Sequence, residues 1–343
     1  MTRNSIAAAL LAALSCLASP AYAQDDKVLN LYSARHYDTD EALYANFTKA
    51  TGIRINRIEA GDEALLERLR NEGANSPADV LLIVDASRLQ AAETAGLFEP
   101  LKSPVLAAKI PAELRSPANA WFAFSTRARI IVYNKAQVFP QDVQTYEDLA
   151  SPRNKGRVCT RPGSHPYMLS LVASVIAHDG EQKAEQWARG AVANMARPPR
   201  GGDTDQIKAV ASGECAVALT NSYYYVRLMR SRKPDDRAVV EKVGVVWPNQ
   251  ANWGTHINVS GGGVLKNAPN KDAARKFLEY LASDEAQAYF ANGNNEWPVV
   301  KTAVARNPEL DSLGTFKADK LTIAEIAART PLAQKLVERA GWR

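Results

Sequence analysis

The first third of the chain alternates short apolar runs with helix-type patterns, and this order constrains the fold more than any other feature. Apolar or alternating runs of strand length lie at 28–33, 53–58 and 78–84. Between them, 40–51 and 62–71 carry apolar residues at helical spacing, and Gly52 ends the first of these helices. This strand–helix–strand–helix–strand order predicts a parallel, doubly wound sheet.

A second series of the same kind begins after a long apolar segment at 121–133. This segment is longer than one ordinary strand and has a polar break at Ser125 and Thr126, so we expect it to cross between two lobes. Further strand-like runs lie at 146–150, 156–160, 216–219, 243–247 and 256–264. The sequence therefore predicts an α/β protein with a ligand cleft between two lobes. We expect lobe 1 to comprise 24–124 and 256–343, and lobe 2 to comprise 125–255.

The N-terminus has the pattern of a cleavable signal peptide over residues 1–23. Arg3 supplies the positive charge, 6–17 is apolar, and 21–23 is a small-residue cleavage site. No later run reaches the roughly 18 apolar residues that a membrane helix needs. We expect an exported periplasmic protein without stable membrane insertion. Export permits a disulfide, and we predict that Cys159 pairs with Cys215.

Charge and motif patterns argue against two classes of function. The 42 Lys and Arg residues are interspersed with 37 Asp and Glu residues, without the basic, aromatic-interleaved stripe that nucleic-acid binding requires. No G-x-S-x-G, H-E-x-x-H or phosphate-binding loop motif occurs. Ser164 and His165 are adjacent on a turn and rarely face each other in such a position. We therefore expect neither a nucleic-acid partner nor an enzyme.

Polar turns that follow three of the predicted strands are rich in phenol and imidazole groups. The first contains His36 and Tyr37, the second leads to Tyr167, and the third contains Tyr223 and Tyr224. In a doubly wound fold, turns at the carboxyl ends of strands meet at one cleft. Each tyrosine taken alone is also compatible with simple packing at a strand end. His36 taken alone is also compatible with a histidine that forms a hydrogen bond within the turn.

The chemistry of converging phenols narrows the choice of ligand. A tyrosine has a pKa near 10, so it ionises at neutral pH only beside a strong positive charge. Calcium prefers carboxylates and carbonyls, and zinc prefers Cys and His. A trivalent cation such as Fe³⁺ is hard and suits phenolate oxygen. Four phenolates would leave such a site with one negative charge, which Arg127 or Arg227 could offset.

At these residues the sequence resembles the periplasmic ferric-ion-binding proteins of ABC iron importers, also called bacterial transferrins. The motifs that match are LYSARHYDTDEALY, EGANSPADVLL, STRARIIVYNK, NSYYYVRL and NGNNEWPV, which cover essentially the whole mature chain. The resemblance implies a type II binding-protein fold, with Fe³⁺ held between the lobes. It is strongest with the tyrosine-rich branch that needs no synergistic anion.

The resemblance also implies roles for individual residues. Tyr37, Tyr167, Tyr223 and Tyr224 would be iron ligands, with His36 a candidate fifth, whereas Tyr225 would point into packing. Arg127 and Arg227 would lie just outside the ligand set. The branch that uses His, Glu and phosphate has a glutamate without a clear equivalent here, although Asp62 and Glu63 lie near its position.

Two functions remain open on the sequence. The first is a monomeric periplasmic protein that captures ferric iron and delivers it to an inner-membrane ABC permease. The second keeps the fold and binds a small organic molecule or oxyanion, such as a polyamine, thiamine or sulfate.

Overall fold

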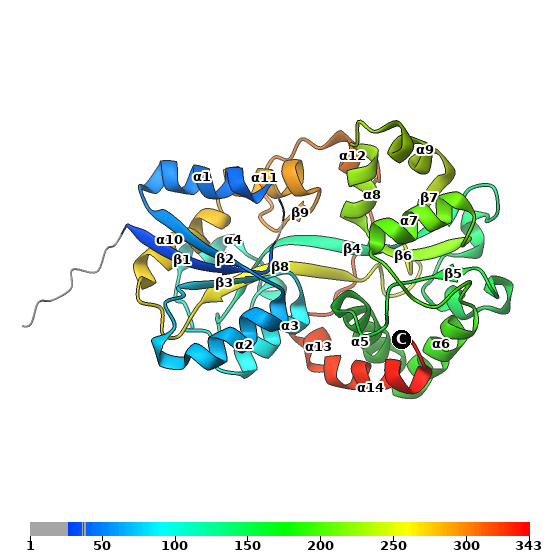
Figure 1. The fold of residues 1–343 in the computed structure, drawn as a ribbon, viewed down its shortest axis with the longest axis horizontal. Coiled ribbons are helices and arrows are strands. Elements are labelled where there is room, and N and C mark those ends of the chain that lie inside the picture. The colour runs from blue at the N-terminus through cyan, green and yellow to red at the C-terminus, as the bar shows by residue number, and fades with distance from the viewer. Residues whose placement is uncertain (1–26, 36, 38) are drawn as a thin grey trace, which may run out of the picture.

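The structure is a computed structural model that describes residues 27–35, 37 and 39–343. The predicted signal at 1–23 lies outside these residues. Two lobes lie side by side along the long axis of the molecule and are joined by extended segments (Figure 1). The nine strands pair in the order β2-β1-β3-β8-β4-β6-β5, with β7 and β9 also paired to β4.

The first lobe is built around the predicted strand–helix repeat. Its strands are β1 (Val28–Ser33), β2 (Arg54–Glu59) and β3 (Val80–Ile83). Its helices are α1 (Asp40–Thr51), α2 (Asp62–Glu72), α3 (Ala86–Thr94), α4 (Pro104–Lys109), α10 (Lys271–Leu281) and α11 (Asp284–Asn294). Strand β1 pairs in parallel with both β2 and β3, so the predicted parallel start of the sheet is confirmed. Beyond β3 the sheet is mixed, because β8 (Ile257–Val264) runs antiparallel to β3.

One long strand carries the chain from the first lobe to the second. Strand β4 (Phe122–Asn134) pairs with β8 over its first half and with β6 (Val217–Asn221) and β7 (Val243–Val246) over its second half. The polar break in the sequence does not end the strand. It appears as a shift of register between Ala123 and Ser125. We refer to β4 and β8 as the hinge strands.

Glycines in β8 let this strand lie close to its neighbours. A Cβ atom on Gly262 would stand 2.4 Å from the carbonyl oxygen of Leu81, and one on Gly263 would stand 2.2 Å from that of Ala120. Both distances are far inside van der Waals contact, so only glycine fits without a shift of the backbone.

The second lobe contains a smaller sheet with helices on both sides (Figure 1). The short strand β5 (Val158–Cys159) pairs in parallel with β6. The helices are α5 (Pro166–Asp179), α6 (Glu181–Ala193), α7 (Asp203–Ser212), α8 (Ser222–Met229) and α9 (Pro234–Lys242). The strand predicted at 146–150 is wrong: Glu147–Ala150 forms a 3-10 turn. Tyr146 is buried there as a side chain, and its hydroxyl donates to the carbonyl oxygen of Arg129.

The last part of the chain differs from the predicted division into lobes. After β9 (Trp297–Pro298) and α12 (Pro308–Asp311), α13 (Ile323–Ala328) packs against α3 and α5. Helix α14 (Thr330–Ala340) then packs against α5 and α6, so it lies with the second lobe. Its apolar face, which includes Leu336 and Val337, is fully buried on that surface. Helical periodicity in a sequence indicates which face of such a helix is buried, but it does not indicate which lobe the helix covers.

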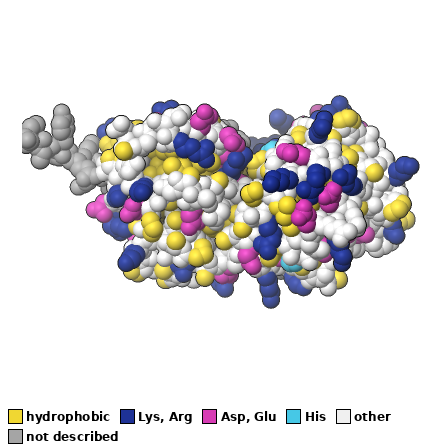
Figure 2. Space-filling view, turned by 90° about the horizontal axis from the view of Figure 1, so that it is seen from below, with side chains coloured by type: hydrophobic (Ala, Val, Ile, Leu, Met, Phe, Trp, Pro, Cys, Tyr) yellow, Lys and Arg dark blue, Asp and Glu magenta, His cyan; other side chains and the backbone are white. Residues whose placement is uncertain are grey.

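The length of the described helices and the charges on the surface are two further features of the structure. No helix within 27–343 has the length and apolar character needed to cross a bilayer. On the face drawn in Figure 2, Lys and Arg side chains stand among Asp and Glu side chains. This mixture is typical of solvated protein surface.

Candidate metal centre

Three turns bring their tyrosines to the cleft between the lobes. Tyr37 follows β1 in the first lobe. Tyr167 lies in the first turn of α5, where the side chain of His165 caps the helix by accepting from the Tyr167 amide at 3.2 Å. Tyr223 and Tyr224 lie in the first turn of α8, which starts directly after β6. Each strand thus ends at the cleft and delivers phenols into it, as the sequence pattern indicates.

The phenol groups lie close together. The hydroxyl oxygens of Tyr167 and Tyr223 are 3.3 Å apart. The ring of Tyr37, from the first lobe, stands edge-on to the ring of Tyr223 with 6.2 Å between ring centres. The rings of Tyr223 and Tyr224 are 4.3 Å apart. Tyr225 points away and donates its hydroxyl to the carbonyl oxygen of Val243, which leaves four tyrosine side chains grouped together.

Burial favours the protonated form of Tyr37, Tyr167 and Tyr223 when no cation is near. Desolvation raises the pKa of Tyr167 to about 12. It also raises the pKa of Tyr37 and of Tyr223, with a further increase from Glu296 for Tyr37 and from Tyr167 for Tyr223. A cation that binds here must therefore displace phenol protons, and a cation of high charge does so most readily.

Guanidinium groups surround the phenols. Arg127 on β4 is 1% exposed and donates to Ser260 Oγ at 2.9 Å. Its Nε and Nη2 atoms have no hydrogen-bond partner among the described residues, and its Cζ atom lies 5.7 Å from the ring centre of Tyr167. Arg227 on α8 is exposed, with Cζ 5.2 Å from the ring centre of Tyr224. Both arginines thus lie where positive charge would stabilise phenolates.

Imidazole groups contribute less to this centre. His36 lies outside the described residues, so its predicted role stays a prediction. Burial and the neighbouring Arg161 lower the pKa of His165 to about 3, and its Nδ1 accepts a backbone hydrogen bond. Across the described part of the chain, no three His, Cys, Asp or Glu side chains are grouped as metal ligands. The described side chains that converge at this cleft are the phenols of Tyr37, Tyr167, Tyr223 and Tyr224.

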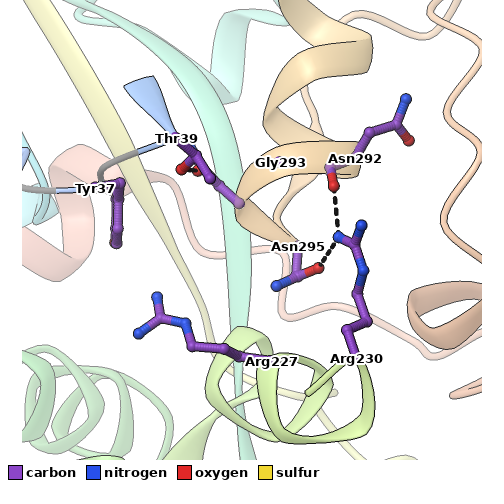
Figure 3. A pocket seen from close by; sticks show the side chains of 8 residues that line it. Tyr37, Thr39, Arg227, Arg230, Asn292, Gly293 and Asn295 are labelled. Carbon is purple, nitrogen blue, oxygen red and sulfur yellow. Dashed lines mark hydrogen bonds between the residues drawn. The ribbon is translucent and has the colours of Figure 1, made fainter. Parts of the chain in front are cut away.

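A cavity of about 540 Å³ opens beside the phenol cluster (Figure 3). Its lining residues are Tyr37, Thr39, Arg227, Arg230, Asn292, Gly293, Asn294 and Asn295. Arg230, the residue directly after α8, reaches across to the end of α11: its Nη1 donates to Asn295 Oδ1 at 2.7 Å and to the carbonyl oxygen of Asn292. This contact joins the helix that bears Tyr223 to the first lobe.

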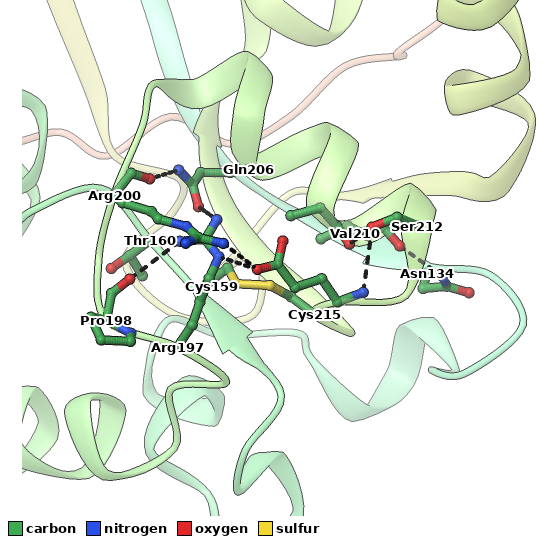
Figure 4. The surroundings of a disulfide bond; sticks show 12 residues. Asn134, Cys159, Thr160, Arg197, Pro198, Arg200, Gln206, Val210, Ser212 and Cys215 are labelled. Atoms are coloured by element: carbon green, nitrogen blue, oxygen red, sulfur yellow. Dashed lines mark hydrogen bonds and ion pairs between the residues drawn. A yellow bond between two sulfur atoms is a disulfide. The ribbon is translucent and has the colours of Figure 1, made fainter.

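Cys159 and Cys215 form a disulfide between β5 and the segment that precedes β6 (Figure 4). Their Cα atoms are 5.8 Å apart, within the range that a disulfide spans. Cys159 ends β5 and Cys215 precedes β6, so the bond ties the two strands that lead to Tyr167 and Tyr223.

Sequence reasoning missed three charged residues around the phenols. Arg35 and Glu296 are buried near Tyr37, and the Cζ atom of Arg161 lies 5.1 Å from the ring centre of Tyr167. The available signal was position: Arg35 and Arg161 each follow a strand within a polar turn, as the tyrosines do. A charged residue in a turn is nevertheless predicted to be exposed to solvent until the tertiary contacts are known.

Comparison with known proteins places the chain among characterised relatives. A family model described as "Bacterial extracellular solute-binding protein" matches residues 42–319. Iron uptake protein A1 of Synechocystis sp. is 49% identical over 319 residues, which cover 93% of this chain and 88% of that protein.

Two solved structures extend the comparison. A Trichodesmium protein (IdiA, FutA), solved in complex with iron and citrate ligands, superposes with a TM-score of 0.88 at 53% identity; the match covers 92% of this chain and all of that one. The ferric binding protein from Campylobacter jejuni superposes with a TM-score of 0.88 at 40% identity, again over 92% of this chain and 100% of that one. The predicted type II binding-protein fold is confirmed by these likenesses.

Proposed function

The chain belongs to the family of bacterial extracellular solute-binding proteins, and we propose that the solute it binds is ferric iron, held by tyrosine side chains in the cleft between its lobes. The observation that carries this proposal is the convergence of four phenols from two lobes. Proteins named for iron uptake or ferric iron binding among its relatives support the same solute.

The charges of the cleft fit a trivalent cation. Tyr37, Tyr167 and Tyr223 are neutral in the absence of a metal because burial disfavours their ionised form and raises the pKa of each. Fe³⁺ would displace a proton from each of Tyr37, Tyr167, Tyr223 and Tyr224, and the loaded group would carry one net negative charge. Two buried nitrogen atoms of Arg127, Nε and Nη2, have no hydrogen-bond partner in the described residues, so this arginine can offset that charge at no cost in broken bonds. Arg227 adds a second cation at the rim.

The geometry supports a proposed ligand set of four tyrosines. Tyr167 and Tyr223 need little movement, because their hydroxyls are already 3.3 Å apart. Tyr224 flanks Tyr223 on the same helix turn, and Tyr37 closes the set from the other lobe. His36, which immediately precedes Tyr37, is the proposed fifth ligand.

The biological role is proposed to be iron import. The signal at 1–23 directs export and is removed, and the mature monomer works in the periplasm. Iron binding brings the lobes together because its ligands come from both. The loaded protein delivers iron to an ABC permease of the inner membrane. Its role is binding and delivery rather than catalysis.

The test is a titration of metal-stripped protein with ferric nitrilotriacetate. Phenolate-to-iron charge transfer should give a visible absorption band at one iron per chain. The double variant Tyr223→Phe, Tyr224→Phe should lose the band and most of the affinity. The matched control is Tyr225→Phe, which removes the neighbouring phenol oxygen of the same triplet and should retain both.

Two results would count against this function. Wild-type protein without a visible band on iron addition would exclude phenolate ligation. Retention of full affinity by the double phenylalanine variant would exclude the proposed ligands. Calorimetry with a polyamine, thiamine or sulfate on the metal-stripped protein separates the alternative solutes, which should give no binding heat.

A further inference from the structure

Arg35 is a buried cation held in a fixed orientation next to Tyr37. Its side chain is 3% exposed. Nε and Nη2 donate to the two carboxylate oxygens of Asp40 at 2.7 and 3.1 Å, a two-point contact that fixes the plane of the guanidinium. Nη1 lies 3.5 Å from Glu296 Oε2. The Cζ atom of Arg35 stands 4.8 Å from the ring centre of Tyr37.

Glu296 joins this arginine to the hinge and to the second lobe. Its side chain is fully buried, and Oε2 also accepts from Ser125 Oγ on β4 at 2.9 Å. Oε1 lies 3.9 Å from Arg127 Nη1. One carboxylate therefore stands between two guanidinium groups. Each guanidinium lies against the ring of a phenol from a different lobe: Arg35 against Tyr37, and Arg127 against Tyr167.

The ion pairs of Glu296 and Asp40 hold the guanidinium group of Arg35 in one position relative to Arg127. Two buried guanidiniums repel each other unless an anion lies between them, and Glu296 is that anion. Asp40 is anchored in turn, because Asn294 Nδ2 donates to its Oδ1 at 2.9 Å. Buried ion pairs of this kind add little net stability, but losing one partner is costly, so they favour a single geometry.

We propose that Arg35 is a positioning residue for iron binding. It holds the ring of Tyr37 in the cleft and, through Glu296, keeps that ring in register with Arg127 and Tyr167 across the hinge. The inference rests on the proposed function, because it assigns Arg35 a role toward the Tyr37 ligand. Residues that orient a metal ligand from behind typically change metal affinity by about 10- to 100-fold when replaced.

The experiment compares Arg35→Lys and Arg35→Met with wild type. Lysine keeps the charge but cannot contact both oxygens of Asp40 and Glu296 together, whereas methionine removes the charge as well. Ferric affinity is measured by competition with nitrilotriacetate or citrate, and the visible band and resonance Raman phenolate modes are recorded on loaded protein. We expect about a 10- to 100-fold loss of affinity for the lysine variant, a loss at least as large for methionine, and an altered band in both.

Arg57→Lys is the matched control. Arg57 also pairs with two carboxylates, Glu41 and Glu59, and its Cζ atom lies 5.0 Å from the ring centre of Tyr44, but it stands outside the cleft. Its replacement should leave the iron affinity and the band unchanged. Circular dichroism and urea unfolding of metal-free protein report whether each variant folds. If Arg35→Met does not fold, Arg35→Lys and Asp40→Asn carry the test.

The outcomes separate this role from the proposed function. Wild-type protein that fails to bind iron overturns both. Wild-type protein that binds iron, with a folded Arg35→Lys variant of equal affinity and identical band, overturns the positioning role alone. A lysine variant that is less stable to urea but spectroscopically identical when loaded would show a purely structural ion pair, and also overturns it.

Discussion

Reduction of the Cys159–Cys215 disulfide should destabilise the second lobe strongly. The bond closes a loop with a sequence separation of 56 residues. In the chain-entropy description, a loop of this length lowers the free energy of folding by about 4 kcal/mol at 25 °C, because the unfolded chain loses conformational freedom. Both cysteines are buried, Cys159 within the β5–β6 pairing and Cys215 just before β6. Other contacts should therefore replace little of the stabilisation that the disulfide provides.

Urea unfolding measures the effect directly. Intrinsic fluorescence and circular dichroism are followed with and without dithiothreitol on metal-free protein. With a denaturant slope of about 2 kcal/mol per M for a lobe of this size, the midpoint of the second-lobe transition should fall by about 2 M on reduction. The double variant Cys159→Ala, Cys215→Ala is the control, and its midpoint should not respond to the reductant.

Iron binding in native buffer should respond much less than stability does. The strands that lead to Tyr167 and Tyr223 are still joined by backbone hydrogen bonds after reduction, including the one from the Ala216 amide to the Arg157 carbonyl at 2.8 Å. A midpoint that shifts by less than about 0.5 M on full reduction would refute the entropic reasoning. Two free thiols found by mass analysis in protein from the periplasm would refute the pairing itself.

Three further predictions concern other parts of the molecule. Burial and the neighbouring Asp85 raise the pKa of Asp62 to about 6, so the folded state binds an extra proton between about pH 4 and 6 and its stability falls as pH rises through that window. The variant Asp62→Asn should therefore be more stable than wild type by about 1–2 kcal/mol at pH 7.5 and nearly equal to it at pH 4. Urea titrations at both pH values measure this difference. Arg230→Ala removes the hydrogen bond to Asn295, and iron release to a chelator should become about three- to tenfold faster with an unchanged visible band; equal rates would show that this contact does not hold the lobes together. Gly262→Ala places a Cβ 2.4 Å from the Leu81 carbonyl oxygen, so thermal unfolding should show a loss of about 2–4 kcal/mol, and a melting temperature equal to wild type would contradict the close approach.

Local patterns in the sequence were enough to predict the elements that carry the phenols. Alternation and apolar runs identified β1, β2, β3 and the strand before Tyr223, because the two-residue and 3.6-residue periods depend only on which face of an element is buried. The rule that ligands bind where parallel strands end then placed Tyr37, Tyr167 and Tyr223 at one cleft. The short distance between the Tyr167 and Tyr223 hydroxyls agrees with that placement.

What the tertiary structure decided depends on contacts between residues far apart in the chain. Glu296 contacts Arg35 because β9 pairs with β4, and β4 lies beside β8 in the sheet. A glutamate late in the sequence is thereby buried against an arginine in the turn that follows the first strand. Local periodicity does not predict a contact between residues so far apart in the sequence, and a single charged residue in a turn is normally predicted to be exposed to solvent. In the same way, the apolar face of α14 indicates that the helix packs against another surface, but it does not indicate that this surface is formed by α5 and α6. Periodicity tells which side of an element is buried, whereas the identity of the partner is set by the packing of the whole chain.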